Sequence, residues 1–203
     1  MSELSAQERI KLAATKVFTL KGLEGARMQD IADEANINKA MLHYYFRNKQ
    51  QLFEIIFEEK LHKIFGAMEL LIFSKEPFEN RIRAFVEKQI SIVLEFPVMP
   101  IFVMLEVRKS PELLDGKFKN IPLDVIRDNF QKVIDAEVLA GNIRRISLEE
   151  LLMNVMSLCI YPIIAEPILK YVLDLNQERY LELIEARKKS VSDLIIKDLK
   201  ILK

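Results

Sequence analysis

The sequence predicts an all-α protein in two parts, with about nine helices in 203 residues. Apolar residues recur at three- and four-residue spacing along nearly the whole chain, which is typical of helices. The strict alternation that marks strands is hard to find. Half of the residues are apolar and 30% are charged, as in globular proteins. The length suits either one large core or a small module joined to a larger one.

The first predicted helix spans residues 5–22. Ser5 and Glu8 have the spacing of a capping box, which marks a helix start. Ile10, Ala14 and Phe18 then follow on one stripe, and Gly22 is expected to end the helix.

Two shorter helices are predicted at residues 27–35 and 38–46. Asn36 separates them, and asparagine tolerates the left-handed conformation that a tight turn between helices needs. Asn38 is the expected N-cap of the third helix. Three short helices, of which the second and third are joined by a tight turn, have the arrangement of a helix-turn-helix.

Caps and prolines divide the rest of the chain into longer helices. They are expected at residues 48–74, 78–95, 101–109, 123–140, 147–173 and 177–200, with the fifth kinked or interrupted at Pro162 and Pro167. We therefore place a helix-turn-helix domain at residues 1–48 and a larger helical domain at residues 49–203.

The third helix presents an unusual outward face. At 100° per residue, with Leu42 and Phe46 directed to the core, Ala40 and Tyr44 point away from it and His43 lies on a flank. A small residue allows close approach of a backbone, and tyrosine and histidine can hydrogen-bond phosphates or base edges. The alternative is that the tyrosines pack on neighbouring helices while the histidine is solvated.

Other functional classes find little support in the sequence. No glycine-rich phosphate loop, metal-spaced cluster or nucleophile elbow is present, so we expect no enzyme, catalytic residue, cofactor or metal. The single cysteine, Cys159, lies between apolar neighbours and is expected to be a small buried residue. The N-terminal segment lacks the pattern of a secretion signal, so we expect a cytoplasmic protein.

The stretch GARMQDIADEANINKAMLHYYFRNKQQLFEII resembles the DNA-binding signature of the TetR/AcrR family of one-component regulators, over about Arg9 to Ile56. This resemblance implies contacts from the second helix, the third helix, and the start of the fourth, where Lys49 would clamp a phosphate. With the outward-face argument, the expected DNA-binding residues are Arg27, Gln29, Lys39, Ala40, Met41, His43, Tyr44, Tyr45 and Lys49. Asn36 and Ala40 stand where the family usually has glycine, and Arg27 where it has threonine or serine.

The same resemblance implies a C-terminal domain that dimerises through its last two long helices, about 147–173 and 177–200, and encloses a ligand cavity. A homodimer is also favoured because one helix-turn-helix contacts few base pairs. Aromatic and methionine side chains suit an adaptable apolar pocket. Those expected to line it are Phe65, Met68, Phe85, Met99, Phe102, Met104, Met153, Met156 and Tyr161.

The sequence thus predicts a sequence-specific, homodimeric transcription regulator. We expect a repressor that a small, hydrophobic effector releases from a DNA operator, although a ligand could equally favour the DNA-bound state. The alternative is a helical ligand-binding or scaffold protein whose helix-turn-helix contacts another protein.

Overall fold

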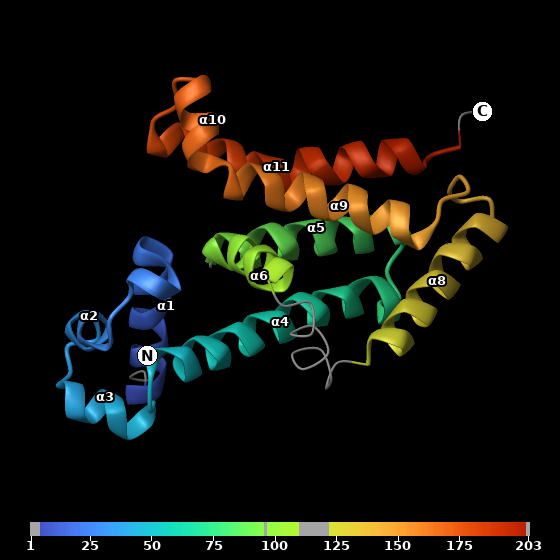
Figure 1. Cartoon of the computed structure of the whole chain (residues 1–203). Helices are drawn as coiled ribbons and strands as arrows, with labels where there is room; N and C mark the ends of the chain where they lie inside the picture. The colour runs from blue at the N-terminus through green and yellow to red at the C-terminus, as the bar shows by residue number, and fades with distance from the viewer. Residues whose placement is uncertain (1–4, 96, 110–121, 202–203) are drawn as a thin grey trace.

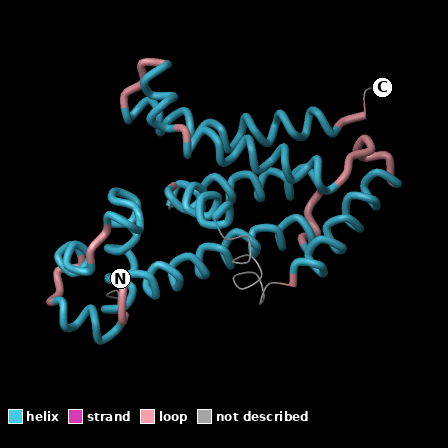
Figure 2. The backbone as a smooth tube through the Cα atoms, viewed as in Figure 1, coloured by secondary structure: helices cyan, strands magenta, loops and turns pink. Residues whose placement is uncertain are grey.

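The computed structural model describes residues 5–95, 97–109 and 122–201, and within these ranges it contains ten helices and no strand (Figures 1 and 2). The predicted all-α class is confirmed. The helices of the N-terminal part are α1 (Ala6–Gly25), α2 (Met28–Glu34) and α3 (Lys39–Tyr45). The longer helices that follow are α4 (Lys49–Phe73), α5 (Phe78–Glu95), α6 (Val98–Lys109), α8 (Leu123–Leu139), α9 (Leu148–Ile164), α10 (Glu166–Val172) and α11 (Gln177–Leu199).

The observed helix ends differ by about three residues from the predicted ones in two places. Gly22 has a positive φ of 67°, but helical turns continue beyond it to Gly25. The helix α6 starts at residue 98, three residues earlier than expected, because Pro100 is compatible with a first helical turn. The interruption expected between residues 147 and 173 is confirmed, since α9 and α10 are separate helices bent by 70° relative to each other.

Two separate clusters of buried apolar side chains form the core, and α4 contributes to both. The N-terminal cluster joins α1, α2 and α3 to the first turns of α4, including Leu52 and Phe53. The C-terminal cluster joins α5, α8, α9 and α11 to the far end of α4, including Leu71. The boundary that we drew at residue 48 therefore falls at the start of a helix that both cores share.

The helices α9 and α11 run side by side on the face of α5 that lies away from α4 (Figure 1). The helices α2 and α3 lie at the opposite end of the molecule from the C-terminus. Arg83 of α5 holds α11 at one point, because its Nη1 donates to Asp193 Oδ1 at 2.5 Å.

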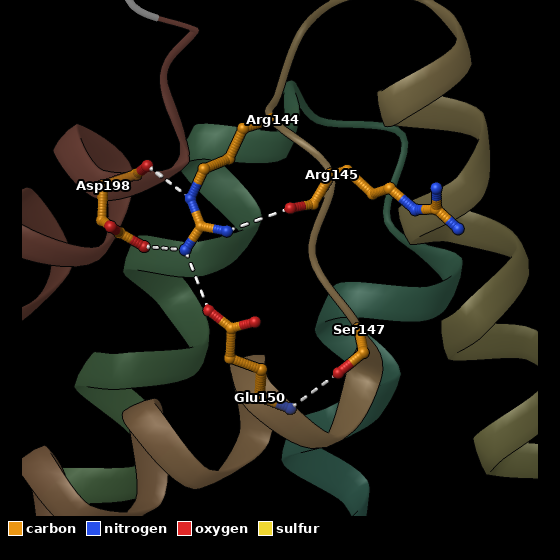
Figure 3. A network of polar contacts seen from close by, with 5 residues as sticks. All are labelled: Arg144, Arg145, Ser147, Glu150 and Asp198. Carbon is orange, nitrogen blue, oxygen red and sulfur yellow. Dashed lines mark hydrogen bonds and ion pairs between the residues drawn. The ribbon is translucent and has the colours of Figure 1, made fainter.

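Arg144, in the loop between α8 and α9, ties the ends of α9 and α11 together (Figure 3). Its guanidinium lies 2.6 Å from the Asp198 carboxylate and 3.0 Å from the Glu150 carboxylate. Its main-chain N–H donates to the Leu199 carbonyl at 2.8 Å. The bonds to Asp198 and then Glu150 raise the pKa of Arg144, and a cation is favoured at the C-terminal end of α11.

None of the described helices is long and apolar enough to cross a membrane alone. The pair formed by α9 and α10 meets that criterion only when the two are taken together, across their 70° bend.

Candidate nucleic-acid interface

The turn between α2 and α3 is built as the sequence predicts. Asn36 adopts a left-handed conformation with φ of 53°. The N–H of Ile37 then donates to the Ala32 carbonyl at 3.0 Å, which closes the turn. Asn38 caps α3, since its Oδ1 accepts from the Met41 N–H at 2.7 Å. Only four residues therefore separate α2 from α3.

The orientation of α3 also agrees with the prediction. Leu42 is fully buried and Phe46 is 2% exposed, so this side of α3 faces the N-terminal core. Tyr44 is 84% exposed on the opposite side. Its ring meets the half-buried ring of Tyr45 edge to face, with centroids 5.2 Å apart. Tyr44 therefore does not pack on a neighbouring helix, as the alternative interpretation required.

The remaining candidates surround Tyr44. Lys39, Ala40 and His43 are exposed on α3, and Met41 is half-buried. The His43 ring nitrogen Nδ1 lies 3.2 Å from the Arg47 carbonyl. The structure thus brings small, aromatic, imidazole and cationic groups to one surface, the combination that can contact phosphates and base edges. Contact with DNA itself stays a prediction.

The two candidates from the α2 region, Arg27 and Gln29, are also exposed. The Arg27 main-chain N–H donates to Asp30 Oδ2 at 3.1 Å. Gln29 Nε2 donates to Asp33 Oδ1 at 2.7 Å, so one N–H of its amide is already engaged within α2. The contact of either side chain with DNA stays a prediction.

Ion pairs that the sequence did not reveal hold α1 against its neighbours. Lys21 Nζ lies 2.9 Å from Asp30 Oδ2 of α2, and this contact lowers the pKa of the Asp30 carboxyl. Lys11 Nζ lies 2.6 Å from Glu59 Oε1 of α4. Both pairs join residues distant in sequence, so spacing alone gives no signal for them.

Lys49 occupies a different place from the one expected of a phosphate clamp. It is the first residue of α4, but its ammonium lies against the end of α1. There it donates to the main-chain oxygens of Leu23, Glu24 and Ala26 at 2.9, 3.0 and 3.1 Å.

The nine residues expected to line a ligand pocket lie in varied surroundings. Phe85 is fully buried in the C-terminal core, and Met68 and Met156 are half-buried. Met104, Met153 and Tyr161 are exposed at 49%, 66% and 57%, so they lie on the outside of the single chain rather than in its interior. The side chains of Phe65, Met99 and Phe102 lie outside the described residues.

Two hollows occur elsewhere on the C-terminal domain. One of about 550 Å³ lies where the start of α5 meets the end of α11, and one of about 520 Å³ lies between α8 and α9. None of the nine expected pocket residues lines either hollow. Among the described residues, no group of three or more His, Cys, Asp or Glu side chains is placed to hold a metal ion.

Cys159 is buried in the C-terminal core, where burial raises the pKa of its thiol to about 12. A thiol with so high a pKa carries little thiolate at neutral pH and is a poor nucleophile. The expectation of a small buried residue is confirmed.

Comparison with known proteins agrees with this geometry. Residues 10–56 match the family described as bacterial regulatory proteins, tetR family. The transposon Tn10 TetC protein of Escherichia coli is 24% identical over 149 residues, which cover 66% of this chain and 73% of that protein. The fatty acid metabolism regulator protein of Bacillus subtilis is 26% identical over 109 residues, covering 54% of this chain and 56% of that protein.

Solved structures share the fold over nearly the full chain. The TetR family transcriptional regulator PfmR from Thermus thermophilus is 25% identical with a TM-score of 0.66, covering 95% of this chain and all of that one. The transcriptional regulator FadR from Bacillus subtilis, solved in complex with stearoyl-CoA, has a TM-score of 0.61. At 18% identity, over 94% of this chain and 98% of that one, it shows likeness of fold alone.

Proposed function

From the membership of this chain in the TetR family of bacterial regulatory proteins, we propose that it represses transcription by binding a two-part DNA operator as a homodimer. The outward face of α3 carries this proposal: Tyr44 is 84% exposed, with Lys39, Ala40 and His43 exposed around it. An exposed tyrosine in the middle of the second helix of a helix-turn-helix supports this proposal, because that helix is the one that enters the major groove.

The homodimer is proposed to form through α9 and α11. These helices expose large apolar side chains, and exposed apolar surface of this kind marks sites of association. On α9, Met153 and Tyr161 lie on one stripe with Ser157 between them. On α11, Leu181 and Leu194 are exposed at 48% and 54%. A second copy packed on the α9 stripe would cover Met153 and Tyr161.

The effector is proposed to be a small apolar molecule bound within the C-terminal domain. Half-buried Met68 and Met156 and buried Phe85 are proposed as part of its apolar surroundings, in which methionine is adaptable. Because α4 belongs to both cores, a ligand that favours one position of α4 in the C-terminal domain also favours one position of the helix-turn-helix. The similarity to a fatty acid metabolism regulator, together with the FadR structure that holds stearoyl-CoA, makes a long-chain acyl thioester the first effector to test.

The DNA-binding proposal is tested by fluorescence anisotropy of the purified protein with DNA from upstream of its own gene and with a scrambled duplex, at two salt concentrations. Tyr44→Ala is expected to weaken binding to the upstream DNA by about tenfold or more, since one good base contact contributes about 1–3 kcal/mol. Tyr171→Ala is the matched control, because Tyr171 is 88% exposed but lies on α10.

Binding to the upstream DNA that Tyr44→Ala weakens and Tyr171→Ala leaves unchanged would support the proposal. Equal, weak binding to both duplexes would call for selection from random sequences. If that selection also recovers no preferred sequence, the helix-turn-helix serves a protein partner instead.

The effector proposal is tested by native mass spectrometry of the purified protein and by adding stearoyl-CoA to the preformed DNA complex. Release of DNA by stearoyl-CoA, but not by coenzyme A alone, would support an apolar effector. A protein that carries no ligand and responds to no acyl thioester would contradict the acyl class.

A further inference from the structure

Lys49 uses its whole donor capacity inside the protein. A lysine ammonium has three N–H groups. The structure directs them to three main-chain oxygens, those of Leu23, Glu24 and Ala26, at 2.9 to 3.1 Å. The side chain is half-buried between the start of α4 and the end of α1. In this arrangement no N–H of Lys49 remains for a phosphate oxygen.

The electrostatics of the two helices explain why Lys49 takes this position. The last carbonyl groups of a helix lack helical donors, and a cation near them is favoured. The last turn of α1 contains no basic residue of its own, so Lys49 supplies the missing cation from another helix. In α4 the same cation stands at the N-terminal end, where the helix dipole disfavours it, and no acidic residue in that first turn compensates.

The segment that Lys49 holds leads directly into α2. Gly22, with φ of 67°, breaks the regular course of α1, and the Ala26 N–H returns to the Gly22 carbonyl at 3.2 Å. Ala26 is buried, and Arg27 follows it as the N-cap residue of α2. The position of residues 23–26 therefore decides where α2 begins.

We propose that Lys49 is a positioning residue for DNA binding, which fixes the turn between α1 and α2 to the start of α4 and makes no phosphate contact. This inference rests on the proposed function, because it assigns Lys49 a role in that same interface. A displacement of the start of α4 would break three hydrogen bonds at once or move α2 with it. Lys49 thus joins the helix shared by both cores to the residues that face DNA.

The salt dependence of DNA binding separates the two roles of Lys49. We would measure the affinity of wild type, Lys49→Gln and Lys132→Gln for the selected operator at four salt concentrations. A lost phosphate contact lowers the log–log salt slope by about 0.9, hence by about 1.8 for a dimer. We expect Lys49→Gln to weaken binding at least tenfold with an unchanged slope. Lys132→Gln removes the same charge from an exposed site on α8 and is expected to change neither quantity.

A second measurement needs no DNA. Hydrogen exchange at the amides of residues 23–29 is expected to be faster in Lys49→Gln than in wild type or Lys132→Gln, at a temperature where circular dichroism shows all three folded. A wild type without operator selectivity would contradict the proposed function, whereas this exchange experiment would still test the positioning of the turn.

Three results would overturn the inference. A slope reduced by about 1.8 in Lys49→Gln would make Lys49 a phosphate contact. An unchanged affinity of the folded variant would reduce its role to stability alone. Unchanged hydrogen exchange at residues 23–29 would show that Lys49 does not hold the turn.

Discussion

Pro162 leaves a main-chain oxygen of α9 without its usual partner, and a side chain of α11 replaces it. Proline has no N–H, so the carbonyl of Leu158, four residues earlier, has no helical donor at this point. Arg187 Nη2 of α11 donates to that carbonyl at 2.8 Å. The hydroxyl of Tyr180, also in α11, donates to the Pro162 carbonyl at 3.1 Å. Two bonds therefore join α9 to α11 at the proline, and the one from Arg187 replaces the bond that Pro162 cannot donate.

This arrangement predicts that Arg187 and Pro162 are energetically coupled. Arg187→Leu should lower the free energy of unfolding by about 1–3 kcal/mol, the range for removal of a charged hydrogen bond whose part-buried acceptor is left unpaired. In a Pro162→Ala background the new N–H of residue 162 can reach the Leu158 carbonyl, so the same change should cost less. Urea denaturation of the two single variants, the double variant and wild type measures the coupling.

A suitable control is Arg179→Leu, which removes an exposed arginine of α11 that pairs with Glu182. Its effect should add to that of Pro162→Ala without coupling. Strict additivity of Arg187→Leu with Pro162→Ala would contradict our account of the Leu158 carbonyl.

At the scale of elements, the turn between α2 and α3 depends on a single residue in a left-handed conformation. Asparagine adopts this conformation at lower cost than alanine, for which it costs about 1–2 kcal/mol. Asn36→Ala should therefore lower the melting temperature and weaken DNA binding, while Asn36→Gly should preserve both. Differential scanning calorimetry and anisotropy would measure the two effects.

Asp174, with φ of 52°, is the matched control because it is the other non-glycine residue of the described chain with a positive φ. It lies between α10 and α11, far from α3. Asp174→Ala should lower the melting temperature without weakening DNA binding by the folded protein. A DNA affinity that Asn36→Ala leaves unchanged would show that the turn tolerates another conformation.

The elements that were predicted well are those with local signals. Asn38 and Ser147 cap helices where the sequence places them, because a cap acts on a backbone N–H three residues away. Glu150 follows Ser147 at the spacing of a capping box, but its side chain is bonded to Arg144 from the preceding loop. Local spacing identified the helix start but not the partner of that carboxylate.

The interactions that were missed join distant parts of the chain. Lys49 contacts carbonyls more than twenty residues earlier, and Arg187 contacts one 29 residues away. The outward face of α3 was predicted because the core residues Leu42 and Phe46 fix its direction. For α9 the sequence offered no core residues that fix the direction of the helix in the same way. Composition alone could therefore not show that Met153 points outward.

At the scale of the whole molecule, α4 joins the two cores as one continuous helix of 25 residues. Leu52 and Phe53 pack in the N-terminal core and Leu71 packs in the C-terminal core, so both cores restrain the same helix. A change in the C-terminal domain that moves α4 therefore reaches the helix-turn-helix without any intervening flexible segment. The distance between the two α3 helices of a dimer then depends on both α4 helices.

This dependence predicts that dimerisation and operator binding fail together. Met153→Glu places a charge on the exposed stripe of α9, where a second copy would bury it, and should convert the dimer to a monomer. A monomer contacts one half-site instead of two and should bind the operator about 10² to 10⁴-fold more weakly than the dimer, because the two recognition helices no longer act as one bivalent ligand. Analytical ultracentrifugation and anisotropy on the same samples would measure both effects.

Leu139→Glu is the control for this prediction, since Leu139 is 90% exposed at the end of α8, outside the proposed interface. It should leave the dimer and the operator affinity unchanged. If Met153→Glu remains dimeric, the dimer forms through a surface other than that part of α9. The other outcome is a monomeric Met153→Glu, with wild-type affinity for a single half-site and reduced affinity for the whole operator. That result would show that the two recognition helices bind the operator as a pair, with half-sites about 34 Å apart.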